Sequence, residues 1–285
     1  MAEPASTATA GVQRHPRASR TARTVALVAI GVLFLIPMLW MLLASFDSRA
    51  SFLLKWPDFT LANYRYALSS GRTTIPMWNS FLLASGTTVL TTVLGLGSAY
   101  ALSRYHIRFR RSILLLVLFA TGLPIELLMI PAYSLFVTLK LIDSIPATIL
   151  FMSAAALPFA IWVLKTFIDQ IPPEIEEAAQ IDGAHALERI RRHVLPLAAP
   201  GIAVAALFTF MNSWGQFIIP YVLIQSANKL PASVAIYEFL TANGQVLYGP
   251  LAAYALLFSL PVLVLYWILS RHISGAFTFG GGVKG

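Results

Sequence analysis

The sequence predicts an all-α fold, a polytopic membrane bundle of six transmembrane helices with a short helix in the loop between the fourth and fifth spans. Three observations lead to this prediction. Of the 285 residues, 58% are hydrophobic and only 11% are charged, whereas a soluble domain carries about 25% charged residues. Long apolar stretches recur along the chain, and successive inter-span loops differ consistently in their lysine and arginine content.

The apolar stretches each approach or exceed the roughly 20 residues that cross about 30 Å of hydrocarbon. A segment in lipid must satisfy its own backbone hydrogen bonds, and these stretches lack the alternating pattern of a membrane β-barrel. We therefore expect helices. The predicted spans are residues 25–46, 78–102, 113–135, 147–167, 201–224 and 251–269.

The lysines and arginines predict the orientation of these spans. Fourteen of the 20 lie in the N-terminal tail, after the second and fourth spans and at the C-terminus, against six in the other loops. Because positive residues are retained on the cytoplasmic side, both termini are predicted to be cytoplasmic. The net charge of +8 is then a topology signal, and no nucleic-acid partner is predicted.

The chain is predicted to form one membrane domain between two tails. Residues 1–23 lack apolar periodicity and are predicted to be a disordered cytoplasmic tail. Residues 24–271 form the transmembrane domain, and residues 272–285 form a cytoplasmic C-terminal tail. No convincing A-x-A site follows the first apolar run, which favours a retained signal anchor over a cleaved signal peptide.

Two prolines interrupt the third predicted span. Pro124 and Pro131 each free a backbone carbonyl that neighbouring groups must satisfy, so this kinked helix either lines a passage or packs against its neighbours. Glu126, between them, is the acidic residue well inside a predicted span, and the cost of burying its charge makes it a site candidate. A six-helix secondary transporter or channel that uses Glu126 is therefore an alternative function.

The fifth predicted span carries a polar stripe. Thr209, Asn212 and Gln216 fall at positions i, i+3 and i+7 and share one helix face. They either line a path for a hydrogen-bonding substrate or bond to a neighbouring helix. Asn79, at the start of the second span, is a further candidate for a substrate path.

The loop 172–200 is too long and too patterned to be a simple turn. Pro172 and Pro173 precede three glutamates, and this favours a helix start because proline is tolerated in the first turn and carboxylates stabilise the positive end of the helix dipole. Gly183 then permits a sharp turn. A second short helix is predicted over 184–194, with three exposed arginines, Arg189, Arg191 and Arg192.

Within this loop, the run Glu177-Ala178-Ala179, followed by Gly183 and Leu195-Pro196, resembles the EAA loop of ABC-importer permeases. In that family the loop forms a coupling helix that docks in a cleft of the nucleotide-binding subunit, so that ATP binding turns the permease outward. The chain departs from the family pattern at His193, where isoleucine is usual. The resemblance implies a cytoplasmic coupling helix with five contact residues, Glu177, Ala178, Ala179, Asp182 and Gly183.

The resemblance extends to Asn79-Ser80, to Ala99-Tyr100-Ala101-Leu102 and to residues 279–285, which are similar to the smaller, maltose-type permease of carbohydrate importers. It implies a multi-pass protein of the bacterial inner membrane that imports a sugar or oligosaccharide, which the binding protein selects. The implied partners are a second permease subunit, two ATPase subunits, an extracytoplasmic solute-binding protein and membrane lipid.

No motif for catalysis or cofactor binding is evident. The sequence has no G-x-x-x-x-G-K-[ST] phosphate loop, so ATP and Mg²⁺ are expected on the partner ATPase and not on this chain. It has no H-E-x-x-H or G-x-S-x-G motif, no cysteine and no clustered metal ligands in the spans. We expect a non-catalytic subunit without a metal site; a polytopic enzyme is a third, weaker alternative.

Overall fold

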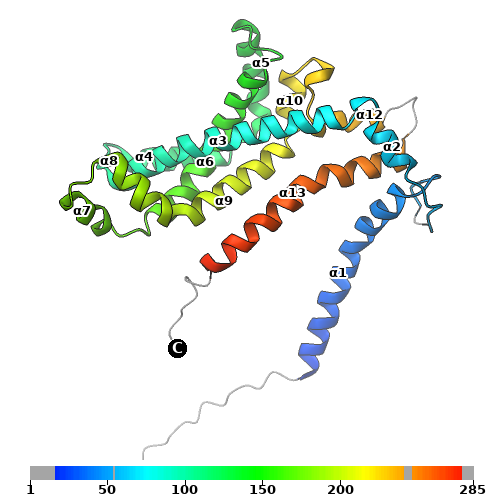
Figure 1. Ribbon diagram of the computed structural model, residues 1–285, viewed down its shortest axis with the longest axis horizontal. Helices are drawn as coiled ribbons and strands as arrows, with labels where there is room; N and C mark the ends of the chain where they lie inside the picture. Colours follow the sequence, from blue (N-terminus) through cyan, green and yellow to red (C-terminus); the bar gives the residue numbers. More distant parts are fainter. Residues whose placement is uncertain (1–16, 54, 241–245, 278–285) are drawn as a thin grey trace, which may run out of the picture.

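The chain is helical in the part that the computed structural model describes, residues 17–53, 55–240 and 246–277. Within these ranges no strand forms, and Asp47 and Phe59 make an isolated antiparallel bridge. The predicted all-α class is confirmed. Five long helices run through the fold (Figure 1): α1 (Arg17–Ser45), α3 (Thr74–Arg104), α6 (Ile145–Ile168), α9 (Leu195–Trp214) and α13 (Tyr248–Phe277).

Short helices connect the long ones. Between α1 and α6 they are α2 (Ala62–Leu68), η1 (Ser69–Gly71), α4 (Arg110–Thr121), η2 (Ile125–Leu128) and α5 (Met129–Thr138). Between α6 and α9 they are α7 (Glu174–Ile181), α8 (Ala186–Arg189) and η3 (Ile190–Val194). Before α13 they are α10 (Ile218–Leu223), η4 (Ala227–Lys229), α11 (Ala232–Ala235) and α12 (Tyr237–Leu240).

The third predicted span is broken rather than kinked. Five described helices are long and apolar enough to cross a membrane, and the pair formed by α4 and Ile125–Thr138, bent by 97°, makes six if it counts as one span. The prediction of one helix over 113–135 is therefore wrong. The chain breaks before Pro124, which is extended and has no N–H to donate. Pro131 lies in the first turn of α5, where proline is tolerated.

The fifth predicted span also differs from the prediction. Its helix runs without interruption over Ala186–Trp214, with a π-helical turn at η3. The separate short helix predicted over 184–194 is therefore wrong, because this segment continues directly into the apolar span. Gly215 ends α9, so the last part of the predicted span, from Ile218, forms the separate helix α10.

The first and last helices extend into the predicted tails. α1 begins at Arg17 and α13 ends at Phe277, so residues 17–23 and 272–277 are helical where tails were predicted. In residues 17–23, arginine and alanine are good helix formers and continue a helix already stabilised by its apolar run. Residues 1–16 and 278–285, which hold the remainder of both predicted tails, lie outside the described residues.

Three helices form the centre of the bundle. α3, α6 and α9 pack along one another, whereas α1 packs chiefly on α13 and leans away from the rest (Figure 1). Small side chains allow the close approach, since Ala160, Ala198 and Ala205 are fully buried. The same close approach favours a glycine at position 95, because a Cβ atom there would lie 3.2 Å from a methyl carbon of Leu164.

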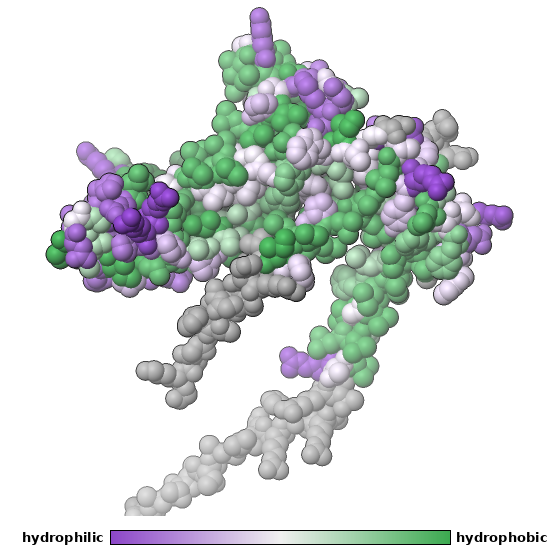
Figure 2. All heavy atoms as spheres, in the orientation of Figure 1, coloured by the Kyte–Doolittle hydropathy of each residue, from purple (hydrophilic) through white to green (hydrophobic). Residues whose placement is uncertain are grey.

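The surface of the bundle is apolar along its middle and polar at its ends. Figure 2 shows hydrophobic surface along α1 and across the middle of the bundle, and hydrophilic side chains around α7 and α8, at the tip of α5 and near α2. On α1, Phe34 is 72% exposed, as expected for a helix that faces lipid. We call the end that carries α7 and Arg104 the α7 end, and the end that carries α2 and Thr74 the α2 end.

A polar cluster, which we call the Asp143 clasp, ties the turn before α6 to the segment after α10. The Asp143 carboxylate accepts bonds from the backbone N–H groups of Gln225 and Ser226, at 3.0 and 2.9 Å, and from the Ser226 hydroxyl at 2.6 Å. Lys229 Nζ donates to the same carboxylate at 2.7 Å. The Lys229 and Ser226 bonds hold the pKa of Asp143 well below its ordinary value.

The Asp143 clasp should affect the melting temperature in a way that depends on pH. We expect Asp143→Asn to lower the melting temperature in detergent by a few degrees, because it removes a charge-assisted bond. A lowered pKa means that the contribution is fully present above the unfolded-state value of about 3.9 and is lost as the pH falls toward the folded-state value. The melting difference from the unmodified protein should therefore stay constant from about pH 7 to 5 and shrink only in stronger acid.

The control for this measurement is Arg49→Gln, which removes an exposed charge paired with Asp58 at 4.0 Å. Such surface pairs contribute little, so its melting temperature should be unchanged. Equal melting temperatures for Asp143→Asn and Arg49→Gln at neutral pH would show that the clasp does not stabilise the fold.

Candidate functional site

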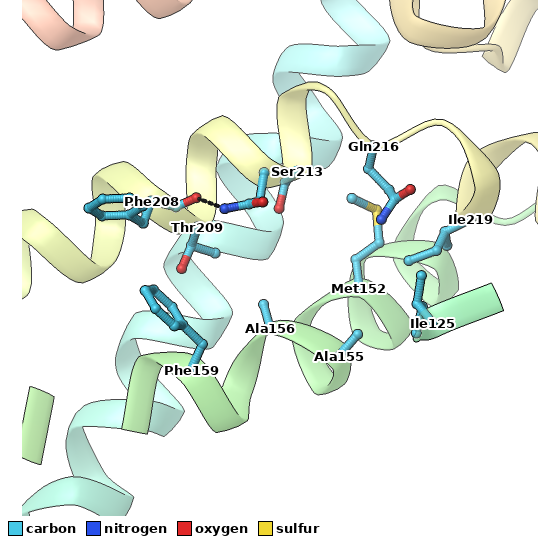
Figure 3. A pocket seen from close by; sticks show the side chains of 11 residues that line it. Ile125, Met152, Ala155, Ala156, Phe159, Phe208, Thr209, Ser213, Gln216 and Ile219 are labelled. Atoms are coloured by element: carbon cyan, nitrogen blue, oxygen red, sulfur yellow. Dashed lines mark hydrogen bonds between the residues drawn. The ribbon is translucent and has the colours of Figure 1, made fainter. Parts of the chain in front are cut away.

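A cavity of about 370 Å³ opens between α6 and α9 (Figure 3). α9 and Gln216 supply one wall, Ile125 of η2 and Ile219 of α10 lie at one side, and α6 supplies the facing wall. The α6 residues of this wall are Met152, Ala155, Ala156 and Phe159. A space of this size holds a small molecule or part of a larger one.

The polar stripe predicted on the fifth span lies in this cavity, since Thr209, Asn212 and Gln216 all line it. Asn212 Nδ2 donates to the Phe208 carbonyl at 2.8 Å, and Gln216 Oε1 accepts from the Ile218 N–H at 3.2 Å. Both bonds are local to the segment that carries the stripe. Thr209 is 3% exposed and its hydroxyl has no hydrogen-bond partner, which leaves a buried polar atom at the cavity wall.

Two aromatic rings that sequence reasoning missed also line the cavity. The centroids of Phe159 and Phe208 lie 5.9 Å apart in an edge-to-face arrangement. For Phe159 the sequence held a signal in its helix periodicity. Met152, Ala156 and Phe159 fall at i, i+4 and i+7 on one face of α6, and the small alanine leaves a hollow between the two large side chains. An apolar and aromatic lining with a few polar groups is typical of a small-molecule site.

Asn79 lies outside this cavity. Its side chain is 6% exposed, and Nδ2 donates to the backbone carbonyls of Asn228 and Leu230 at 2.9 and 3.1 Å. The neighbouring Ser80 hydroxyl accepts a bond from the Ala232 N–H at 2.8 Å. Asn79 therefore fastens the segment before α11 to the start of α3.

Glu126 is also not part of the cavity wall. It lies in η2, immediately after the break in the third predicted span, and is exposed in this chain. The expectation of a carboxylate buried inside the span is wrong for this chain, because the chain turns at Pro124 and carries Glu126 to the surface. Its neighbour Ile125 faces the cavity instead.

The helix predicted after the fourth span is present as α7. Ala179 packs inward at 6% exposure, whereas Ile181 is 87% exposed, an unusual position for a large apolar side chain. The other predicted contact residues form an exposed surface around it: Glu177, Ala178, Asp182 and Gly183.

A Schellman motif ends α7 at Gly183. The Ala184 N–H donates to the Ala179 carbonyl at 2.9 Å and the Gly183 N–H donates to the Gln180 carbonyl at 3.1 Å, which is the bond pair of that motif. Gly183 has φ +88°, a conformation that glycine adopts without steric cost. Asp182 takes part through its backbone, whose N–H bonds the Ala178 carbonyl.

The residues after this turn differ in part from the prediction. Arg191 and Arg192 are exposed as predicted, but Arg189 is half-buried and its guanidinium bonds the Gln180 side chain. His193, where the sequence departs from the EAA pattern, lies in the π-helical turn η3. π-helical turns occur often at functional sites.

Residues 91–275 match the family model described as "binding-protein-dependent transport system inner membrane component". The chain belongs to this family. The matched region includes α6, α7 and α9, and therefore both the cavity and the exposed surface of α7. The protein is accordingly a multi-pass permease of the inner membrane.

Curated relatives agree with this assignment. The permease is 35% identical over 226 residues to the putative ABC transporter permease protein ORF1 of Streptomyces antibioticus, covering 79% of this chain and 97% of that protein. It is 32% identical to the diacetylchitobiose uptake system permease protein NgcG of Streptomyces coelicolor, covering 89% and 86%. It is 33% identical to the trehalose transport system permease protein SugB of Mycobacterium tuberculosis, covering 79% and 82%.

Solved structures share the fold. A chain from the crystal structure of a bacterial ABC transporter that imports the acidic polysaccharide alginate superimposes with a TM-score of 0.77 at 22% identity, covering 90% of the permease and 98% of that chain. A chain of the MetNI methionine ABC transporter gives a TM-score of 0.56 at 18% identity, covering 71% and 95%. At these identities the likeness concerns the fold alone.

Proposed function

We propose that the permease carries a sugar or oligosaccharide along the cavity between α6 and α9, in a transporter driven by two separate ATPase subunits, one of which docks on α7. A second permease subunit would complete the passage, and an extracytoplasmic solute-binding protein would deliver the sugar. The observation that carries the proposal is the exposed α7 surface in a chain of this family. ATP and Mg²⁺ belong to the partner subunits.

The chemistry of the cavity supports a saccharide. Sugars present many hydroxyl groups and apolar C–H faces, and they require hydrogen-bonding side chains and aromatic rings where lipid offers neither. The stripe of Thr209, Asn212 and Gln216 supplies the first, and Phe159 and Phe208 supply the second. The relatives named for diacetylchitobiose and trehalose support the same substrate class.

The shape of α7 supports docking into another protein. Helix-in-groove recognition needs a short helix with an apolar anchor, and Ile181 at 87% exposure provides one. Glu174, Glu176 and Glu177 in the first turn stabilise the helix, and acidic residues there disfavour binding to an anionic lipid leaflet. We place the α7 end in the cytoplasm, in agreement with the arginine distribution.

Co-purification and uptake test this function. The permease, expressed with the genes of its transporter, should retain an ATPase subunit, and proteoliposomes should accumulate radiolabelled trehalose, maltose or diacetylchitobiose only with ATP and the loaded binding protein. Glu126→Gln should leave this uptake intact. A permease that retains no ATPase, or uptake that depends on a proton gradient and Glu126, would instead favour a secondary transporter.

The unpartnered hydroxyl of Thr209 gives a further prediction. Thr209→Val keeps the shape of the side chain and removes a group that no protein atom bonds, so the fold should be unaffected. If the hydroxyl bonds the sugar, the uptake rate at low sugar concentration should fall about three- to tenfold. Uptake kinetics in proteoliposomes measure this change.

Thr87→Val is the matched control for Thr209→Val. Thr87 is also fully buried with an unpartnered hydroxyl, but it lies on α3 and does not line the cavity. Its substitution should leave uptake unchanged. Equal effects of the two variants would show that the Thr209 hydroxyl does not contact the sugar.

A further inference from the structure

α7 is joined to the end of α3 by residues outside the EAA pattern. Glu176, next to the motif, points into the protein and meets Arg104 and Tyr100 of α3. We propose that Glu176 and Arg104 are positioning residues that transmit the displacement of α7 to α3 during transport. This inference rests on the proposed function, because it concerns how an ATPase docked on α7 moves the bundle.

The bonds at this junction fix the position of α7 in several directions. Arg104 Nε donates to Glu176 Oε1 at 2.6 Å, and the Tyr100 hydroxyl donates to Glu176 Oε2 at 2.7 Å. Arg104 Nη2 also donates to the Ile171 carbonyl, just before α7, at 2.8 Å. Both oxygens of one carboxylate are thus held by side chains one turn apart on α3, which resists rotation of α7 as well as sliding.

The pair is buried. The side chains of Arg104 and Glu176 are 13% and 10% exposed, whereas Arg192 of the neighbouring Arg192–Glu188 pair is 73% exposed. Removing two charges from water is costly, and apolar side chains of similar size often stabilise a fold as well or better. What the buried pair supplies is a fixed geometry between two helices.

The same junction reaches α6. The Ser103 hydroxyl donates to Asp169 Oδ1 at 2.6 Å, and Lys165 Nζ bonds the other oxygen of Asp169. Arg104 Nη1 donates to the Ser103 hydroxyl at 3.4 Å. The ends of α3 and α6 are therefore tied together, and a displacement that enters at Glu176 reaches the helix that forms one wall of the cavity.

Apolar contacts alone would hold α7 less specifically. Ile175 packs against the cluster that contains Tyr100, Ile168 and Ile171. Such burial is non-directional, so it keeps α7 at the surface without fixing its register. The ion pair is the directional part of the junction.

The test measures sugar transported per ATP hydrolysed in proteoliposomes that contain the whole transporter and its loaded binding protein. The probe is whichever of radiolabelled trehalose, maltose and diacetylchitobiose gives the largest ATP-dependent uptake. Glu176→Gln retains the shape of the side chain and removes the ion pair. We expect ATP hydrolysis within about twofold of the unmodified transporter and a transport ratio about tenfold lower.

Arg108→Gln is the matched control. It removes a positive charge from the segment that follows α3, where Arg108 is exposed and stacks over Phe109, and it leaves the Arg104–Glu176 pair intact. Its transport ratio should equal that of the unmodified transporter. If Glu176→Gln gives the same ratio as Arg108→Gln, or lowers uptake and ATP hydrolysis in parallel, the inference is overturned.

A double variant separates transmission from damage to the fold. Arg104→Gln with Glu176→Gln leaves no unpaired buried charge, so the complex should assemble even if a single variant assembles poorly. Because the single variants Glu176→Gln and Arg104→Gln and the double variant all break the same junction, the double variant should lower the transport ratio about as much as either single variant. Losses that multiply in the double variant, or a normal ratio in it, would contradict the inference.

Failure of this inference differs from failure of the proposed function. If the inference alone is wrong, Glu176→Gln transports normally while substitutions in the exposed α7 surface, such as Ile181→Asp, still abolish ATP-driven uptake. If the proposed function is wrong, the permease retains no ATPase subunit, and Ile181→Asp has no effect on uptake.

Discussion

Replacing Gly183 with valine is expected to abolish ATP-driven uptake while the transmembrane bundle stays assembled. Gly183 has φ +88°, and its N–H and that of Ala184 donate the two backbone bonds that end α7. An L-residue in this left-handed region costs about 1–2 kcal/mol, and a β-branched side chain is a severe outlier there. Relief of this strain reopens the turn, so that α7 and Ile181 leave their orientation on the bundle.

Measurement of uptake and of ATPase retention distinguishes this effect from misfolding. Beyond the adjoining residues, no atom lies within 4 Å of the position that a Cβ at Gly183 would take, so the loss should follow backbone conformation and not side-chain size. Gly183→Asn, which tolerates φ above zero, should keep most of the uptake. Gly97→Val places the same side chain at an equally open glycine in α3 and should transport normally; normal uptake by Gly183→Val would refute the prediction.

The long helices were predictable because apolar length in a membrane protein leaves few alternatives to a helix. The start of α7 was predictable for a local reason, since Pro173 and the following glutamates act on the first turn alone. Gly183 was predictable as a turn, again from one residue's own conformational range. In each case the physical cause lies within a few residues of the sequence.

The inward position of Glu176 was not predictable in this way. Glu174, Glu176 and Glu177 are chemically equivalent along the sequence, and only the rotation of α7 against α3 decides which of them meets Arg104. Asn79 is a similar case, because its partners are carbonyls 149 and 151 residues away in the chain. Long-range pairing of polar side chains depends on tertiary packing that helix periodicity does not specify.

The polar side of the cavity was predictable from the sequence, but the aromatic side was not. The polar face of Thr209, Asn212 and Gln216 follows from spacing on one helix, but the aromatic wall depends on how α6 faces α9. The break before Pro124 was likewise predictable only in part. Proline predicts a disturbed helix, whereas the 97° bend and the exposure of Glu126 depend on what α4 and α5 pack against.

The packing of α9 on α6 leads to the second large expected effect, that of Gly201→Val. A Cβ atom at Gly201 would lie 2.4 Å from Cγ and 2.6 Å from Cβ of Phe167. Rotation of the Phe167 ring cannot relieve the contact with its Cβ, so α6 and α9 must separate. Overpacking of this kind costs about 1–3 kcal/mol and often more. We expect a lower melting temperature in detergent and a strongly reduced yield of assembled transporter.

Phe167→Ala tests whether this contact is the cause. It removes the ring and leaves the Phe167 Cβ in place, so combined with Gly201→Val it should restore only part of the melting temperature, because the 2.6 Å contact remains. Gly97→Val again serves as the control and should melt normally, since apart from its own helical turn no atom lies within 4 Å of its Cβ position. Full recovery in the double variant would assign the strain to the ring, and no recovery would place it elsewhere along α9. Because α6 and α9 also form the two walls of the cavity, partial recovery of stability should be accompanied by partial recovery of sugar uptake.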